Sequence, residues 1–397
     1  MQKIAIGDTK SGAVTRTPVP MLDLKRQYEP IQKEIGEALA HVLATQQFIL
    51  GDHVADFERS AAAHLGVKHA LGCSSGTDAL WLALAAAGIR AGDSVVTTPF
   101  SFFASVSSIL RAGATPVLAD IDPVTFNLSP SAVEAVLDGK RGAAVKAILP
   151  VHLYGMCADA TAFTKLARER GLTIVEDAAQ AWGAEWNGTK AGALGDSAAF
   201  SFYPTKNLSA AGDAGMVTTN RDEVAERVRM LRNQGMRRRY HHDELGWNAR
   251  MDGFQGAVLA VKLKYIGAWN EQRRTLAARY ESLFAKAGLK ESGPYPARGV
   301  LTPKEAPGAK HVWHQYVIRV SRRDALREFL TARGIGSEIY YPVPLHLQEA
   351  LKGLGYSEGD FPGAERAACE VLALPMFPEL RDDEQETVVA AIAEFLS

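Results

Sequence analysis

The stretch that decides the fold is SAAFSFYPTKNLSAAGDAGMVTT, residues 197–219, in which one lysine separates two short apolar segments. Residues 198–202 and 215–219 are predicted strands, and Lys206 lies in the loop between them. A lysine amine attacks a carbonyl carbon only when it is unprotonated, which requires burial or nearby positive charge to lower its pKa. The aromatic residues before Lys206 can supply that burial. Taken alone, the pattern favours a surface lysine with a buried stem.

Short apolar segments alternate with helical patterns on the N-terminal side of this stretch. Strands are predicted at 70–73, 94–98, 115–120, 144–150 and 172–177, and helical periodicity occurs at 31–42, 54–61, 79–84, 101–112 and 158–170. Strands that are apolar on both faces and separated by helices form a mostly parallel sheet. We therefore predict an α/β fold with a mostly parallel central sheet flanked by helices.

The C-terminal side predicts a smaller α+β domain. Helical periodicity occurs at 223–231 and again over 254–280, where one long helix is expected to link two domains. Beyond it, strands are predicted at 313–320 and 336–341, and helices at 324–333, 362–372 and 383–396. The chain is accordingly divided into a mobile leader (1–20), a large α/β domain (21–265) and a small C-terminal α+β domain (266–397).

Composition excludes several classes of protein. The 397 residues contain 44 basic and 45 acidic side chains, so no overall charge attracts nucleic acid or an anionic membrane. The three cysteines lie far apart, which is typical of a reduced protein rather than a disulfide scaffold or a zinc site. The longest apolar run, residues 79–89, is too short to cross a bilayer. We expect a cytoplasmic protein that binds neither nucleic acid nor membrane.

Polar residues follow several predicted strands, at the sheet edge where α/β proteins bind ligands. Gly76 and Thr77 begin a helix and suit a phosphate, although a simple helix cap explains them as well. Asp177 ends a strand and can pair with a ring nitrogen, or merely cap the next helix. With Ser201 and Lys206, these residues offer a phosphate anchor, a partner for a pyridinium and an amine, which together are what pyridoxal phosphate requires.

Five motifs, in this order, resemble the DegT/DnrJ/EryC1/StrS family of pyridoxal-phosphate-dependent sugar aminotransferases, which have the aspartate aminotransferase fold (type I). The resemblance runs from about Met21 to the C-terminus. The motifs are GTDAL (76–80), EDAAQA (176–181), SFYPTKN with GDAGM (201–216), GWNARMD (246–252) and YPVPLH (341–346).

The resemblance implies a role for each site residue. Lys206 would bind the cofactor aldehyde, and Asp177 would pair with the pyridine nitrogen. The remaining cofactor contacts would be Gln180 beside the phenolic oxygen, Gly76, Thr77 and Ser201 on the phosphate, and Phe102 stacked on the ring. Helix packing explains Phe102 nearly as well. No metal is implied.

Two further residues imply a homodimer with shared active sites. Asn248 matches a residue that reaches the phosphate bound by the neighbouring subunit, and Arg250 would face that subunit's substrate. Tyr340 and Tyr341 would also contact substrate, but some relatives carry histidine where this chain has Tyr340. That departure weakens any inference about the sugar.

The implied reaction transfers an amino group from an amino acid, L-glutamate by expectation, to a nucleoside-diphosphate-linked keto sugar in two half-reactions. Residues 242–263 look more like relatives that aminate C3 than C4. Arg237 to Arg239 are candidates for the diphosphate, although such charge runs usually form a solvated face. His241 and His242 have no further ligands at metal-binding spacing.

Three alternatives remain. A sugar dehydratase of this family would carry histidine in place of Lys206. A non-catalytic regulator that keeps the cofactor is disfavoured because the whole catalytic set is present. A nicotinamide oxidoreductase would need a Gly-x-Gly-x-x-Gly motif after the first strand, and the chain has none there.

Overall fold

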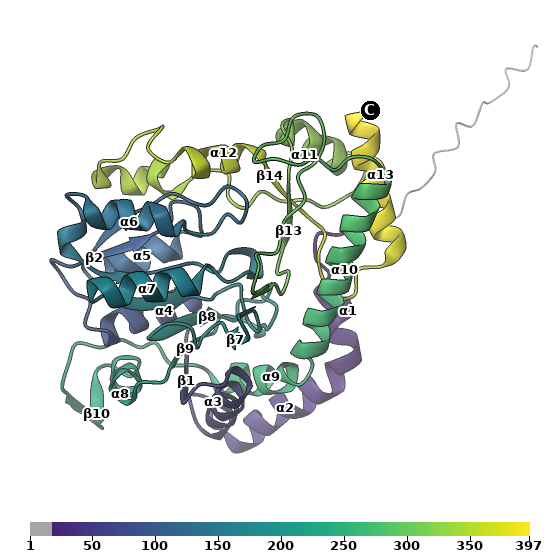
Figure 1. Cartoon of the computed structure of the whole chain (residues 1–397). Helices are drawn as coiled ribbons and strands as arrows, with labels where there is room; N and C mark the ends of the chain where they lie inside the picture. Colours follow the sequence, from purple (N-terminus) through teal and green to yellow (C-terminus); the bar gives the residue numbers. More distant parts are fainter. Residues whose placement is uncertain (1–17) are drawn as a thin grey trace, which may run out of the picture.

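The computed structural model describes residues 18–397 and contains a central seven-stranded sheet in the order β1-β9-β8-β5-β4-β2-β3 (Figure 1). Only β9 runs antiparallel to its neighbours, β1 and β8. The strands are β1 (His69–Cys73), β2 (Ser94–Thr97), β3 (Thr115–Leu118), β4 (Val145–Ile148), β5 (Thr173–Asp177), β8 (Ser197–Ser201) and β9 (Gly215–Thr219). The predicted α/β fold and its mostly parallel sheet are confirmed.

Helices cover both faces of this sheet because successive strand residues point to opposite sides. In β2, Val95 packs in the same apolar cluster as α4, α5 and α8, whereas Val96 packs with α6 and α7 on the other face. That second face is continued over β1, β8 and β9 by α3 and α9. These helices are α3 (Asp52–Leu65), α4 (Gly76–Ala86), α5 (Ala104–Arg111), α6 (Pro130–Asp138), α7 (Ala160–Arg170), α8 (Asp222–Leu231) and α9 (Gly253–Leu263).

The single long helix predicted over 254–280 is wrong. The chain forms α9 and then α10 (Ile266–Lys286), with a break at Lys264 and Tyr265. Both of these side chains bind Glu34 of α2 (Gln32–Thr45), Lys264 Nζ at 3.1 Å and Tyr265 through its hydroxyl. The break therefore lies where α2 contacts the start of α10.

The C-terminal part pairs β13 (Tyr316–Arg319) with β14 (Val371–Leu374) in an antiparallel ladder. Its helices are α11 (Arg323–Thr331), α12 (Pro362–Glu370) and α13 (Asp382–Leu396), the last packed against α10 (Figure 1). Two predictions fail here. The helix expected at 362–372 ends at Glu370 and continues directly as β14, and the strand expected at 336–341 is reduced to one bridge, Glu338 to Ala373.

Both ends of the described chain meet in this C-terminal part. Val19 forms a parallel bridge with Ile335, and Arg26 of α1 (Leu24–Tyr28) pairs with Glu384 at 2.8 Å. Residues 18–20, assigned above to the leader, are thus placed beside α11, whereas residues 1–17 of the expected leader lie outside the described residues.

Hydrogen bonds from two segments of the C-terminal part tie it to the sheet. The Asp120 carboxylate, just after β3, accepts from the Gly363 and Ala364 amides at 2.8 and 3.0 Å and so caps α12. The Leu345 amide donates to the Pro99 carbonyl at 2.7 Å. The loop that carries Tyr340 and Tyr341 is therefore fixed against the carboxyl edge of the sheet.

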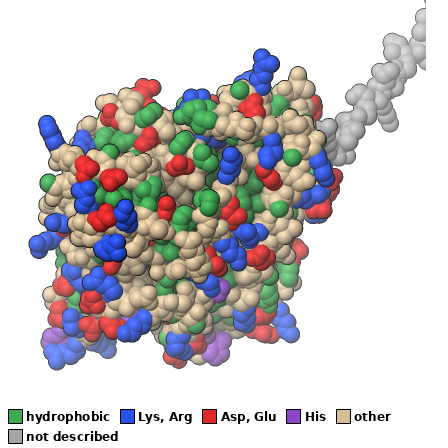
Figure 2. All heavy atoms as spheres, in the orientation of Figure 1, with side chains coloured by type: hydrophobic (Ala, Val, Ile, Leu, Met, Phe, Trp, Pro, Cys, Tyr) green, Lys and Arg blue, Asp and Glu red, His purple; other side chains and the backbone are tan. Residues whose placement is uncertain are grey.

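Short strands complete the structure. They are β6 (Glu185–Trp186), β7 (Thr189–Lys190) and β12 (Ala309–Lys310) in one sheet, and β10 (Met236–Arg238) with β11 (His241–His242) in an exposed hairpin. Figure 2 shows acidic and basic side chains interspersed over the face in view.

Candidate active site

Asp177 lies at the carboxyl end of β5, between β4 and β8, and only 4% of it is exposed. Its Oδ2 accepts from the Ser105 hydroxyl at 2.7 Å, and its Oδ1 accepts from the Ala179 amide at 3.2 Å. Burial raises the pKa of this carboxyl, and Ser105, Ala179 and the nearby Lys206 oppose that rise. The site therefore contains a buried carboxyl group whose charged form is favoured by its hydrogen-bond donors and opposed by burial.

Lys206 lies in the loop after β8, where its amide donates to the Tyr203 carbonyl at 2.8 Å. The residue as a whole is half-buried, but burial of its amine lowers the pKa to about 8, against the opposing effect of Asp177. About a tenth of this amine is therefore unprotonated at pH 7, far more than for an ordinary lysine, and the unprotonated form is the one that attacks a carbonyl. The structure brings together the lysine and the carboxylate that the sequence selected.

A buried polar network holds the residue after this lysine. Asn207 Nδ2 donates to Asn270 Oδ1 at 2.9 Å and to the Val312 carbonyl at 3.0 Å, while its Oδ1 lies 3.0 Å from His314 Nδ1. Burial holds the pKa of His314 well below its usual range. The ring is therefore neutral, and Nδ1 is its donor.

The start of α4 lies against the end of β8. A Cβ on Gly76 would approach Ser201 Cβ to 2.5 Å, and a Cβ on Gly215 would approach the Ser75 carbonyl oxygen to 2.2 Å. Both positions therefore require glycine. Ser75 caps α4 by accepting from the Asp78 amide at 3.1 Å, so the Gly76 and Thr77 amides at the helix start have no intrahelical partners. Amides of this kind can bind an anion, and the Ser201 side chain lies beside them.

Gln180 connects this edge of the sheet to the C-terminal part. Its Oε1 accepts from the Tyr154 amide at 2.6 Å, and its Nε2 donates to the Tyr341 hydroxyl at 3.2 Å. Tyr154 in turn donates through its hydroxyl to the Tyr340 carbonyl. The two tyrosines expected to meet substrate are thus adjacent to the residue expected beside the cofactor.

Phe102 is 59% exposed and precedes α5, so packing within that helix does not account for it. Its ring centroid lies 6.4 Å from that of Tyr341. An exposed aromatic ring beside Tyr341 offers a flat surface to a planar ligand.

Asn248 and Arg250 lie on a segment that runs beside the start of the α4 loop, where the Ala249 carbonyl accepts from the Ser74 amide at 3.2 Å. Asn248 is exposed, and its Oδ1 accepts from Arg250 Nε at 3.1 Å. Arg250 also donates to Asn233 Oδ1 at 3.2 Å. The hydrogen bonds described for these two side chains are thus with each other and with Asn233, and none is with Asp177 or Lys206.

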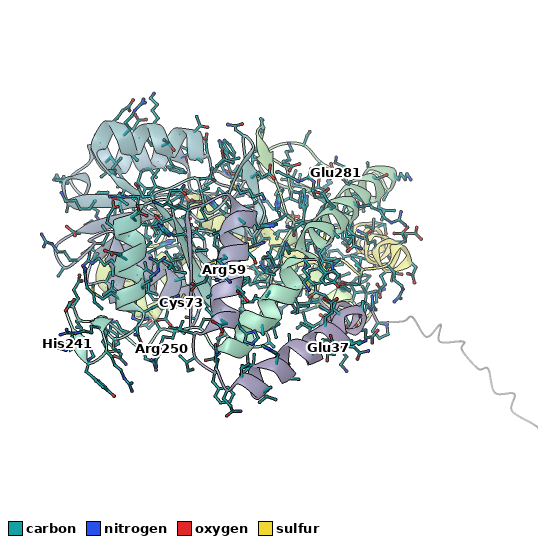
Figure 3. All side chains as sticks on the ribbon, turned by 90° about the horizontal axis from the view of Figure 1, so that it is seen from below. Glu37, Arg59, Cys73, His241, Arg250 and Glu281 are labelled. Atoms are coloured by element: carbon teal, nitrogen blue, oxygen red, sulfur yellow. The ribbon has the colours of Figure 1, made fainter. Side chains whose placement is uncertain are left out.

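Arg237 to Arg239 and both histidines after them are part of the exposed β10–β11 hairpin, and Figure 3 shows His241 at the periphery of the molecule. Arg237 pairs with Asp243 at 3.4 Å. Among residues 18–397, no group of three or more His, Cys, Asp or Glu side chains is placed to hold a metal ion. In the same part of the chain, no helix is both long and apolar enough to cross a membrane.

Sequence reasoning did not find Ser105, Asn207 as an anchor, or His314. Ser105 was hidden among ordinary small residues of a helical segment. His314 is 107 positions from Asn207, so only the fold brings the two together.

The arrangement fits pyridoxal phosphate chemically. Four features lie at one edge of the sheet. They are a buried carboxyl group, an amine with a pKa of about 8, the free amides at the start of α4 beside Gly76, and an exposed aromatic ring. Such a set can bind a phosphorylated pyridine and form a covalent bond to its aldehyde.

Comparisons with known proteins agree with this chemistry. Residues 29–393 match the model of the DegT/DnrJ/EryC1/StrS aminotransferase family. The chain is 50% identical to a "Pleiotropic regulatory protein" of Geobacillus stearothermophilus, with 95% of this chain and 98% of the relative covered. It is 43% identical to a dTDP-3-amino-3,4,6-trideoxy-alpha-D-glucose transaminase of Streptomyces venezuelae, over 95% and 96% of the two chains.

Solved structures show the same fold. DesV of Streptomyces venezuelae, in complex with a ketimine intermediate, superposes with a TM-score of 0.91 at 43% identity, covering 96% of this chain and 99% of that one. NtdA of Bacillus subtilis, with bound cofactor PMP, superposes with a TM-score of 0.87 at 29% identity, over 96% and 86%. The family model and these relatives extend over nearly the whole chain, and the chain therefore belongs to the DegT/DnrJ/EryC1/StrS aminotransferase family.

Proposed function

We propose that this protein is a pyridoxal-phosphate-dependent aminotransferase that moves an amino group from L-glutamate to a nucleoside-diphosphate-linked 3-keto sugar. The observation that carries the proposal is that the buried carboxyl group of Asp177 and the low-pKa amine of Lys206 lie close enough to affect each other's pKa. The name of the 43% identical transaminase supports a 3-keto rather than a 4-keto sugar.

Each residue has a distinct task in this proposal. Lys206 would hold the cofactor covalently. Once released, its amine would take a proton from the substrate carbon that bears the amino group and deliver it to the cofactor carbon. When bound, pyridoxal phosphate withdraws electrons from that carbon. Asp177 pairs with the ring nitrogen and keeps it charged, because an adjacent carboxylate favours the protonated form.

The remaining contacts orient the cofactor and the substrate. Gly76, Thr77 and Ser201 hold the phosphate, Gln180 lies beside the phenolic oxygen, and Phe102 covers the ring. Tyr340 and Tyr341, which are both partly exposed, contact the substrate.

Shared active sites in a homodimer form the second part of the proposal. Among the described residues, the side chains of Asn248 and Arg250 form hydrogen bonds with each other and with Asn233, and none with Asp177 or Lys206. Large apolar side chains are exposed at Leu43 in α2 and at Ile49 in the segment between α2 and α3. A second copy of the chain that covers this surface would bury both side chains. Asn248 of the first subunit would then reach the cofactor phosphate bound by the second.

One alternative has support of its own. The 50% identical relative is named a pleiotropic regulatory protein, so a regulator that binds the cofactor without turnover is the second candidate. Retention of Lys206 with a lowered pKa argues for catalysis, and it also argues against a dehydratase of this family.

Three measurements test these proposals. Borohydride reduction of the purified protein is expected to fix the cofactor on Lys206, and labelling elsewhere would overturn the assignment. L-glutamate is expected to abolish the visible absorbance of the bound cofactor, and nucleotide-linked 3-keto sugars to restore it better than 4-keto sugars. If no amino donor changes the absorbance, the regulator is favoured.

Subunit mixing tests the shared site. Lys206→Ala and Asn248→Ala chains, each inactive alone, are expected to regain part of the activity when combined, because each mixed dimer contains one site with neither substitution. Absence of recovery in verified heterodimers would exclude a shared site.

A further inference from the structure

We propose that Ser105, supported by Ser101, is a positioning residue that orients the Asp177 carboxylate toward the cofactor ring nitrogen and stabilises its charge through a hydrogen bond. The inference rests on the cofactor role proposed above for Asp177. It adds two hydroxyl groups, neither of which touches the reacting atoms, to the machinery of the site.

The geometry defines a chain of two hydroxyl groups. Ser105 lies in the first turn of α5 and is fully buried, and its Oγ is 2.7 Å from Asp177 Oδ2. Ser101, also buried, has its Oγ 2.8 Å from Ser105 Oγ. An ionised carboxylate only accepts hydrogen bonds, so Ser105 must donate its single proton to Asp177. Ser101 is then the donor to Ser105.

This direction strengthens the bond to the carboxylate. A hydroxyl that accepts one hydrogen bond donates a stronger one, and a bond to a charged acceptor is stronger than a bond between neutral groups. The 2.7 Å contact is also shorter than the 3.2 Å contact from the Ala179 amide to Asp177 Oδ1. Ser105 is therefore the stronger of the two described donors to this carboxyl.

The other groups that face Asp177 do not replace Ser105. Lys206 is withdrawn when it bonds to the cofactor. The ring nitrogens of His152 are engaged elsewhere, since Nε2 lies 2.9 Å from Glu176 Oε2 and Nδ1 accepts from the Ala158 amide at 3.1 Å. The Tyr341 hydroxyl accepts from Gln180. Ser105 favours the charged form of Asp177 against the effect of burial, so loss of its hydroxyl would weaken the interaction of this carboxylate with a protonated ring nitrogen.

Helix α5 supplies a matched control. Ser108 is as deeply buried as Ser105, but its hydroxyl donates to the Ser105 carbonyl of its own helix at 3.3 Å. Ser105→Ala and Ser108→Ala therefore remove the same atom from the same helix, and only the first removes a donor to Asp177.

The experiment compares Ser105→Ala, Ser101→Ala and Ser108→Ala in the holoenzyme. The first readout is the cofactor dissociation constant, measured by equilibrium dialysis. We expect it to rise by about tenfold to a hundredfold in Ser105→Ala, as for the loss of a hydrogen bond to a charged group. A smaller rise is expected in Ser101→Ala and none in Ser108→Ala.

The second readout is the pH at which the visible absorbance of the Lys206-bound cofactor changes. We expect a shift to higher pH in Ser105→Ala, because a less charged ring nitrogen repels the protonated linkage less. In an Asp177→Asn background, Ser105→Ala is expected to add little to the change in either quantity, since the charged acceptor is already gone.

Equal behaviour of Ser105→Ala and Ser108→Ala would overturn the inference. If Ser105→Ala does not fold, Ser101→Ala carries the same test, because it leaves Ser105 in place. A wild-type protein that borohydride does not label at Lys206 would contradict the proposed function instead, so the two failures are distinguishable.

Discussion

The ring of His314 donates from Nδ1 to Asn207 Oδ1 across 3.0 Å, and so fixes the residue that directly follows Lys206. Asn207 also donates to Asn270 and to the Val312 carbonyl. Two segments that are distant in the sequence, one at Asn270 and one at residues 312–314, thereby determine the position of this loop. The lysine is oriented by the protein itself, before any ligand binds.

Asn207→Ala is expected to lower the free energy of unfolding by about 2–5 kcal/mol, because it leaves His314 and Asn270 buried with unpaired polar groups. Urea unfolding measures the change. Asn220→Ala, which removes one exposed bond to the Lys68 amide, is the control and is expected to cost less than about 1 kcal/mol. Equal losses in both variants would contradict this account.

Stability is expected to fall as the pH is lowered from 7 toward 5. Burial lowers the pKa of His311 to about 3 and holds that of His314 well below its usual range. Below the unfolded-state pKa of about 6.5, only the unfolded chain takes up these protons. Each ring therefore contributes a loss of up to about 1.4 kcal/mol per pH unit.

Urea midpoints at pH 7, 6 and 5 measure that slope. His314→Gln removes one titrating ring and is expected to flatten the curve relative to wild type, whatever its effect on stability at pH 7. An unchanged slope would show that His314 is not the group that takes up the proton.

Gly76→Ala is expected to weaken cofactor binding by at least tenfold, because its Cβ would stand 2.5 Å from Ser201 Cβ and displace the start of α4. Fluorescence titration of the apoprotein with pyridoxal phosphate measures the affinity. Gly36→Ala lies in α2 with nothing within 4 Å of the new methyl group and is expected to stabilise the protein by about 0.5–1 kcal/mol. An unchanged affinity in Gly76→Ala would remove Gly76 from the phosphate site.

Asp120→Ala is expected to lower the free energy of unfolding by about 1 kcal/mol through loss of the α12 cap. Hydrogen exchange of the Gly363 and Ala364 amides is expected to accelerate in the same variant. Asp138→Ala removes an exposed pair with Arg170 and is expected to change stability by less than about 1 kcal/mol. Protection of both amides in Asp120→Ala would disprove the cap.

The sequence predicted the sheet because each buried strand is a short apolar run bounded by turn residues. β14 was missed for the opposite reason: Val371 follows Glu370 of α12 with no turn residue between them, and only its pairing with β13 makes the segment a strand. The break between α9 and α10 lies at two residues that contact Glu34, which is far away in the sequence.

The same distinction holds in the site. Asp177 and Lys206 were predicted because each belongs to a local motif, and the structure places them close enough to influence each other's pKa. Ser105 and His314 act through neighbours that the fold brings to them, and neither has a local pattern that distinguishes it from a core residue. Positioning residues are for this reason hard to predict from one sequence.

The bridge between Val19 and Ile335 sets an order on biosynthesis. Residue 19 leaves the ribosome long before residue 335 is made. The interval between the synthesis of Arg26 and that of its partner Glu384 is longer still. Because domains fold as their residues emerge, the central sheet can assemble while the N-terminal segment is still unpaired. Completion of the C-terminal part is then the last event, and a chain truncated before α13 is expected to leave Arg26 without Glu384, on an unfinished surface open to chaperones and proteases.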